Sequence, residues 1–201
     1  IPVSIFWRIM QPVFNRFSFK LVNAIYFHLN RHRNKRQYKS RRLHFFHFNF
    51  LHNQIPEFRQ IYGKRGFVEI QPLIPNSNGI DGIRQIFELC QSHGKESYLC
   101  GLKYHCTKGG MLSFAGDGFS LGIDIPMPAG GSLALHPFLT DLFELLASLG
   151  ARIHLAKDSS LSAQKGPDFL MDFEEFVTAK AIIDPDCLFV SDMFKRVFKE
   201  C

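Results

Sequence analysis

The stretch Gly66-Phe67-Val68-Glu69-Ile70-Gln71-Pro72-Leu73-Ile74-Pro75 is the part of the sequence from which the fold can be worked out. Its apolar residues and its closing proline predict a β-strand. Residues two apart in a strand share a face, so Glu69 and Gln71 are expected on the same side. Asn76-Ser77-Asn78-Gly79 then predicts a turn. The apolar residues that follow recur at helical spacing and predict an amphipathic helix ending at Gly94: Ile80, Ile83, Ile86, Phe87 and Cys90.

The succession of strands and helices continues to residue 155. Further strands are predicted over 97–104, 119–126 and 151–155, and a helix begins at Pro137 and ends at Gly150. The order over 66–155 is β-α-β-β-α-β, which is typical of the split βαβ arrangement, an antiparallel sheet with helices on one face. We therefore expect the α+β class. A helical C-terminal segment over 156–201 should follow, with one helix stopping at Asp184-Pro185 and a last short helix over 193–200, capped by Ser191-Asp192.

The composition of the 201 residues is that of a globular protein. Hydrophobic residues make up 46% and charged residues 21%, which excludes wholesale disorder and collagen-like repeats. The 22 phenylalanines supply enough apolar surface for a core, and no run of about 18 uncharged apolar residues predicts a membrane-spanning helix. Five cysteines without CxxC spacing argue against a disulfide scaffold or a zinc site and fit a reducing compartment. Because the first residue is Ile1, we expect the chain to be part of a longer protein.

Positive charge is concentrated at the N-terminal end of the chain. Residues 1–65 hold 13 Lys and Arg and a single acid, Glu57, and seven of these cations lie within 31–42. Such a run can be an irregular loop in solvent. It can also bind the head groups of anionic lipids, or nucleic acid. No nucleic-acid-binding motif supports the last of these, so nucleic acid is disfavoured.

The same N-terminal segment has a weaker structural pattern than the rest. A short amphipathic helix is predicted over 13–28, after Pro12, whereas 31–65 is expected to be irregular. Three histidines lie in that irregular part, at His44, His47 and His52. They have no carboxylate or cysteine beside them, so we expect no metal site.

Four polar residues stand out because they interrupt apolar strand regions: Glu69, Gln71, Lys103 and Lys157. In an antiparallel sheet all four could project from one face into a shared cavity, where a lysine holds an anionic intermediate or moves a proton. The alternative is that they lie on the solvated face of a sheet that has helices on one side only. His154, taken by itself, is typical of a core histidine. Gly116-x-Gly118 precedes a strand, so it fails the dinucleotide-binding fingerprint.

Five short motifs, taken in order, resemble a known family. They are Phe67–Pro75, Leu102-Lys103, Phe119–Pro126, Ala156-Lys157-Asp158-Ser159 and Ile183–Met193. Together they resemble the C-terminal half of FAD-linked oxidoreductases of the vanillyl-alcohol-oxidase type. The resemblance is greatest to the decaprenylphosphoryl-ribose oxidase members, and the sugar lactone and alditol oxidases are more distant. It covers most of 60–201.

The resemblance implies a division of the chain and a reaction. A basic, aromatic-rich segment over 1–65 would precede a substrate domain over 66–153, and 154–201 would be the returning segment of a flavin domain whose main part is absent. The implied reaction oxidises a sugar-ring hydroxyl by hydride transfer to flavin. FAD would bind only together with the missing N-terminal domain, in cis or in trans.

The resemblance also implies roles for particular residues. Lys157 and Lys103 would be catalytic, Gln71, Glu69 and Gly122 would bind substrate, and His154 would join Lys157 at the cofactor. Three positions depart from the ribose oxidases: Glu69 replaces a Gln, Gly122 a Cys and His154 a Tyr, although the lactone oxidases have a His three residues before the corresponding Lys. The substrate would be a sugar or a polyprenyl-phosphoryl sugar.

Two other interpretations remain open from the sequence. The chain could be a non-catalytic basic module that uses 31–42 on anionic lipid or nucleic acid, or it could be an inactive gene fragment. The oxidoreductase interpretation implies a cytoplasmic protein or one bound peripherally at the inner membrane, since a polyprenyl-linked substrate would lie in that membrane.

Overall fold

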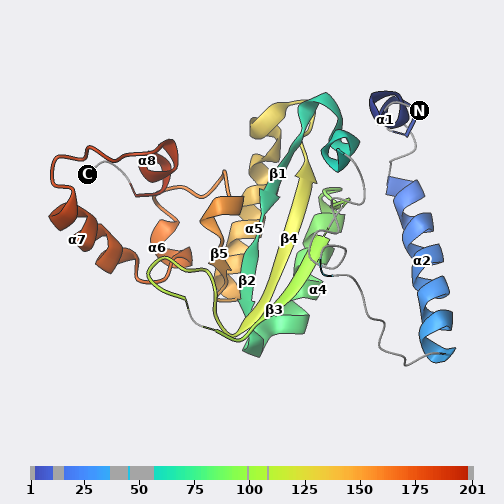
Figure 1. Cartoon of the computed structure of the whole chain (residues 1–201), viewed down its shortest axis with the longest axis horizontal. Helices are drawn as coiled ribbons and strands as arrows, with labels where there is room; N and C mark the ends of the chain where they lie inside the picture. Colours follow the sequence, from blue (N-terminus) through green and yellow to red (C-terminus); the bar gives the residue numbers. More distant parts are fainter. Residues whose placement is uncertain are drawn as a thin grey trace. The chain divides into compact units, whose positions relative to one another are not determined.

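The chain forms two compact units, Ile1–Gly66 and Phe67–Cys201. The computed structural model describes residues 3–10, 16–36, 45, 57–98, 100–107 and 109–198 (Figure 1). Residues 67–153 and 154–201 belong to the same compact unit. The boundary expected between a substrate domain and a returning flavin-domain segment stays a prediction.

The second unit is built on an antiparallel sheet whose central strand is β4 (Gly118–Pro126). One edge of β4 pairs with β3 (Cys100–His105), and the other pairs with β1 (Phe67–Ile70) and then with β2 (Pro72–Pro75). The short strand β5 (Arg152–Ile153) pairs with β2. This is the antiparallel sheet with the split βαβ succession that the sequence predicts, so the expected α+β class is confirmed.

The first predicted strand is divided into two at Gln71. β1 and β2 both pair with β4, in one continuous register from Phe67 opposite Pro126 to Pro75 opposite Gly118. The interruption comes directly before Pro72, which has no backbone N–H to donate to a hydrogen bond between strands. The Gln71 carbonyl instead accepts a hydrogen bond from the backbone N–H of His154 at 3.0 Å. The junction of β1 and β2 is thereby tied to the segment that follows β5.

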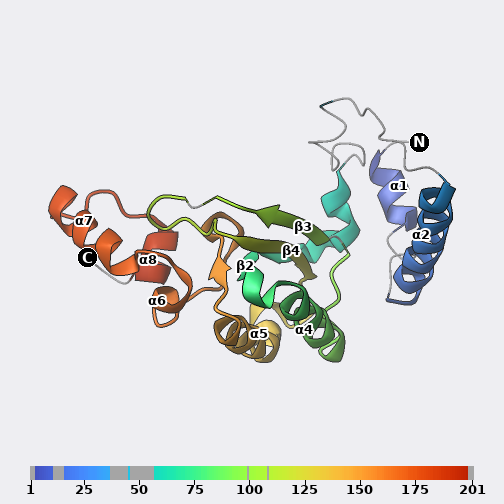
Figure 2. The same cartoon turned by 90° about the horizontal axis from the view of Figure 1, so that it is seen from below.

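Two helices cover one face of the sheet, as predicted. Figure 2 shows α4 (Gly79–Ser92) and α5 (His136–Ser148) together on the same side of the strands. α4 ends where the sequence predicts, because Gly94 adopts a left-handed backbone with φ of 61°. The fully buried side chains between the two layers form the core: Ile70, Ile74, Leu121, Ile123 and Ile125 from the strands, and Ile86, Phe138, Leu142 and Leu146 from the helices.

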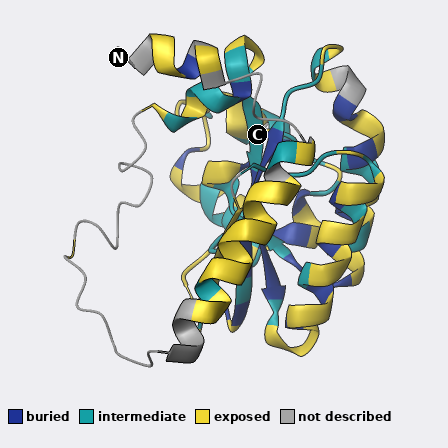
Figure 3. Ribbon diagram, turned by 90° about the vertical axis from the view of Figure 1, so that its right-hand side faces the viewer, coloured by how far each residue is buried: buried dark blue, intermediate teal, exposed yellow. Residues whose placement is uncertain are grey.

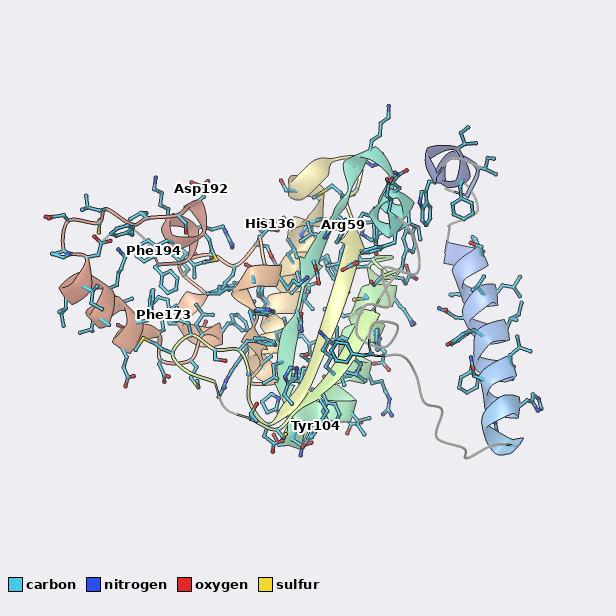
Figure 4. The ribbon with its side chains drawn as sticks, viewed as in Figure 1. Arg59, Tyr104, His136, Phe173, Asp192 and Phe194 are labelled. Atoms are coloured by element: carbon cyan, nitrogen blue, oxygen red, sulfur yellow. The ribbon has the colours of Figure 1, made fainter. Side chains whose placement is uncertain are left out.

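The C-terminal segment is helical, as expected. It contains α6 (Gly166–Phe169), α7 (Phe173–Ile183) and α8 (Asp192–Phe198). α7 stops directly before Asp184, and the Ser191 hydroxyl accepts the backbone N–H of Phe194, so the predicted stop and the Ser191 cap are both confirmed. α7 and α8 pack through a cluster of rings, two of which are labelled in Figure 4: Phe173, Phe176, Phe194 and Phe198. Cys187 takes part in a disulfide, which the cysteine spacing did not predict.

The first unit departs from the sequence-based expectation. α1 (Val3–Met10) packs against the 3₁₀ helix η3 (Phe58–Arg65), and α2 spans Arg16–Arg36. The expectation that 31–65 is irregular is wrong at both ends, since α2 continues to Arg36 and η3 occupies 58–65. Arg and Lys are good helix formers, and no Gly or Pro lies between 13 and 36, so nothing local stops α2 near residue 28. His44, His47 and His52 lie outside the described residues.

α2 is exposed along most of its length (Figure 3). Its exposed residues include the large apolar side chains Phe17, Leu21, Ile25 and Leu29. No helix in the described part of the chain is both long and apolar enough to cross a bilayer.

Candidate functional site

The face of the sheet opposite the helices carries the polar residues that the sequence singled out. Ile70 and Ile74 of the first strand pair, and Leu121 and Ile123 of β4, face the helices and belong to the core. Residues one position along a strand point the other way. The helix-free side, here called the open face, therefore carries Glu69, Gln71, Lys103, Ser120 and Gly122.

An ion pair joins the first strand to the turn after β5. The turn is η6 (Leu155–Lys157), and the Lys157 ammonium donates a hydrogen bond to Glu69 Oε2 at 3.0 Å. The side chains are 42% and 29% exposed, so solvent screens the pair and it contributes at most about 1 kcal/mol to stability. Its importance is geometric, because it places a cation and a carboxylate side by side on the open face.

A buried hydrogen-bond network lies next to that ion pair. Gln71 Nε2 donates to Ser120 Oγ at 3.2 Å, and Ser120 Oγ lies 2.7 Å from His105 Nε2. Ser120 is fully buried and Gln71 is 6% exposed. Buried polar groups must be hydrogen-bonded, and here the three side chains satisfy one another. Gln71 is therefore held in one orientation by Ser120 of β4, which in turn contacts His105 of β3.

His154 lies against the ring of Phe114 on the same face. The two rings are stacked, with centroids 4.1 Å apart and planes 10° from parallel, and Phe114 also meets His105 edge-on at 5.6 Å. Burial lowers the pKa of His154 below its ordinary value of 6.5, the charges of Lys157 and Lys103 lower it further, and Glu69 opposes them. His154 is consequently neutral at pH 7 and able to accept a proton.

Gly122 leaves bare backbone in the middle of the open face. It pairs with Gly101 across the β3–β4 ladder, so neither strand projects a side chain there. A Cβ placed on Gly122 would lie 4.0 Å from Glu69 Oε1, and one on Gly101 would meet nothing within 4 Å. The backbone of the two strands is thus open beside the Glu69 carboxylate.

The structure brings the sequence-predicted site residues onto one side of the sheet. Glu69 and Lys157 are in direct contact, Gln71 belongs to the neighbouring network, and Lys103 stands opposite Ser120 in the strand register. Sequence reasoning missed His105, Ser120 and Phe114. The first two could have been found, because His105 lies two residues after Lys103 and Ser120 two before Gly122, on the same face of each strand. Phe114 lies in a loop with no such periodicity.

The described residues contain no group of three or more His, Cys, Asp or Glu side chains placed to hold a metal ion.

Comparison with known proteins agrees with the motifs at low identity. No protein family model matches the chain. The chain is 26% identical over 184 residues to decaprenylphosphoryl-beta-D-ribose oxidase of Mycolicibacterium smegmatis, a match that covers 91% of this chain and 38% of that protein. It is also 33% identical over 88 residues to an uncharacterized protein in the mprA 5' region of Streptomyces coelicolor, covering 44% of this chain and 23% of that protein. The chain thus spans 38% or less of the length of each of these relatives.

The first match supports the oxidoreductase class that the motifs indicate. The resemblance to lactone and alditol oxidases stays a prediction.

Proposed function

We propose that the chain is the substrate-binding portion of an FAD-dependent oxidoreductase that oxidises a hydroxyl of a sugar ring. The observation that carries this proposal is the convergence of Glu69, Gln71, Lys103, His154 and Lys157 on the open face of one sheet. These residues come from β1, from the link between β1 and β2, from β3 and from the segment directly after β5. The similarity to a ribose oxidase over 91% of the chain supports the class of reaction.

The open face is suited to hold the ring system of FAD but not its diphosphate. No side chain projects from Gly101 or Gly122, which lie next to the Glu69–Lys157 pair, and we place the flat ring system and the substrate over this backbone. Lys157 and His154 would contact the cofactor there. The diphosphate of FAD needs backbone N–H groups at a Gly-rich turn that opens a helix, whereas Gly116-x-Gly118 leads into β4. We therefore assign diphosphate binding to a separate domain, in cis or in trans.

Different residues on the open face can take different roles in the oxidation of a hydroxyl. When bound, FAD would accept the hydride from the ring carbon. Lys103 and Lys157 would donate hydrogen bonds to substrate oxygens, and Glu69 and Gln71 would orient neighbouring hydroxyls. The proton that leaves the oxidised hydroxyl needs an acceptor. Neutral His154 suits that role, because its lowered pKa keeps it unprotonated at pH 7.

The test is to measure anaerobic flavin reduction by candidate sugars in the complete enzyme, with the upstream coding sequence or the partner chain included. Lys157→Ala should slow reduction by about 100-fold or more. Lys195→Ala, on the exposed side of α8, is the matched control and should leave the rate unchanged. Full turnover in Lys157→Ala would exclude the proposed role of Lys157. Absence of flavin from a complete, folded enzyme would exclude the class.

A second proposal concerns the partner of the first unit, which we suggest is the surface of an anionic membrane. α2 carries six Lys and Arg and no acid, and it exposes Phe17, Leu21 and Ile25. Cations steer such a helix to negative head groups, and exposed aromatic and aliphatic side chains insert at the interface. Co-sedimentation with vesicles containing phosphatidylglycerol should be strong at low salt and weak at high salt. Equal binding to neutral vesicles, or preference for nucleic acid in the same assay, would refute the proposal.

A further inference from the structure

The turn that carries Lys157 is fixed by the residue directly after it, Asp158. The Asp158 carboxylate is fully buried. It accepts the backbone N–H of Leu161 at 2.9 Å, and it accepts both the backbone N–H and the hydroxyl of Ser160, at 3.1 and 3.0 Å. A short loop whose own carboxylate binds its next backbone groups has little freedom to change shape. The backbone of Lys157 is thereby held from its C-terminal side.

Arg196 of α8 holds the same turn from outside. Its Nη1 donates to Asp158 Oδ2 at 2.9 Å and to the Leu161 carbonyl, and its Nη2 donates to the Asp158 carbonyl at 3.1 Å. The planar guanidinium contacts a carboxylate and two carbonyls at once, which an ammonium group cannot do with the same geometry. The C-terminal helix is therefore attached to the turn at three acceptors.

From this fixed turn the Lys157 side chain reaches the open face. The Lys157 backbone N–H donates to the His154 carbonyl at 2.9 Å, so the turn is also held from its N-terminal side, and the ammonium meets Glu69. A lysine that is 42% exposed has many rotamers open to it. Its position beside Glu69 therefore depends on where its backbone is held.

We propose that Arg196 and Asp158 are positioning residues, which hold the Lys157 ammonium against Glu69 on the open face. α8 then belongs to the site, although its Arg196 contacts the turn and not the open face itself. A role of this positioning in catalysis rests on the proposed function of Lys157. The positioning itself does not depend on that function.

The test is the rate at which Lys157 reacts with an amine-acylating reagent, read by mass spectrometry on the full chain without flavin. Glu69→Gln calibrates the assay by removing the partner of Lys157 directly, and an exposed ion pair of this kind should protect the lysine about two- to fivefold. Arg196→Gln should raise the rate of Lys157 by a similar factor and leave Lys95 and Lys165 unchanged. Arg84→Gln, which breaks the exposed Arg84–Asp81 pair on α4, is the matched control.

The double variant separates positioning from a general loss of structure. If Arg196 acts only by placing Lys157 beside Glu69, adding Arg196→Gln to Glu69→Gln should not raise the Lys157 rate further. Additive increases, faster labelling of every lysine, or an unchanged Lys157 rate in Arg196→Gln would each overturn the proposal. If Lys157 labelling responds as expected but Lys157→Ala keeps full turnover in the complete enzyme, the positioning stands and the proposed function of Lys157 fails.

Discussion

Replacing Asp158 with alanine should destabilise the second unit by about 3 kcal/mol. The substitution removes a fully buried carboxylate that accepts three hydrogen bonds from Ser160 and Leu161 and pairs with Arg196. Removing one partner of a buried ion pair costs roughly 3–5 kcal/mol. The lower end applies here because the Arg196 side chain is 29% exposed and water can reach part of it after the substitution.

Urea unfolding followed by far-UV circular dichroism measures this loss directly. The midpoint should fall without a change in slope, and the melting temperature should fall by about 10 °C, since a domain of this size loses roughly 3–5 °C per kcal/mol. The control is Asp81→Ala on α4, which breaks an ion pair whose side chains are 65% and 80% exposed. It should change stability by less than about 0.5 kcal/mol. Equal stability of Asp158→Ala and wild type would refute the argument that this carboxylate holds the turn.

Three further outcomes are expected, each with its own measurement. The unfolded chain binds more protons than the folded one below about pH 6.5, because the pKa of His154 is lowered on folding. Stability should therefore fall as the pH drops from 7 through that range, and His154→Gln should lack this component. Identical pH dependence of the two proteins in urea would contradict this. Phe114→Ala should raise the pKa of His154 toward 6.5, because burial is the largest cause of the shift. Titration of the His154 ring by NMR checks it, and an unchanged value would be incompatible with the stacking argument. Gly118→Ala should destabilise the sheet by about 2–3 kcal/mol, since its Cβ would lie 2.2 Å from the Ile74 carbonyl oxygen. Gly110→Ala, whose Cβ meets nothing within 4 Å, should stay within about 0.5 kcal/mol of wild type, and similar values for the two glycine variants would count against the clash.

Most of the second unit could be predicted because its signals are local. α4 runs from Gly79 to Ser92, as the spacing of its isoleucines and the stop at Gly94 indicate. The order of strands and helices then leaves few ways to build an antiparallel sheet with helices on one face. The first unit was harder to predict. Its basic run suggested an irregular loop, whereas α2 continues through the first part of that run to Arg36 because helix propensity there is favourable.

Only part of the candidate site could be predicted from the sequence. Period-two spacing places Glu69 and Gln71 on one face and links Lys103 with His105, since a strand repeats every two residues. No local pattern predicts that the Ser120 hydroxyl satisfies both Gln71 and His105, or that Phe114 stacks on His154. These contacts depend on strand register and on a loop path, which are decided by packing across the whole sheet.

What the sequence alone determined is the type and order of the elements of the second unit and the side of the strands on which its polar residues lie. These follow from periodicities of 3.6 and 2 residues, and such patterns are set by neighbours along the chain. Only the tertiary structure decided that Lys157 meets Glu69, 88 positions away, and that Arg196 of the last helix holds the turn that carries Lys157. Pairs so distant in sequence are brought together by burial of the shared core, whose free energy depends on all the elements at once.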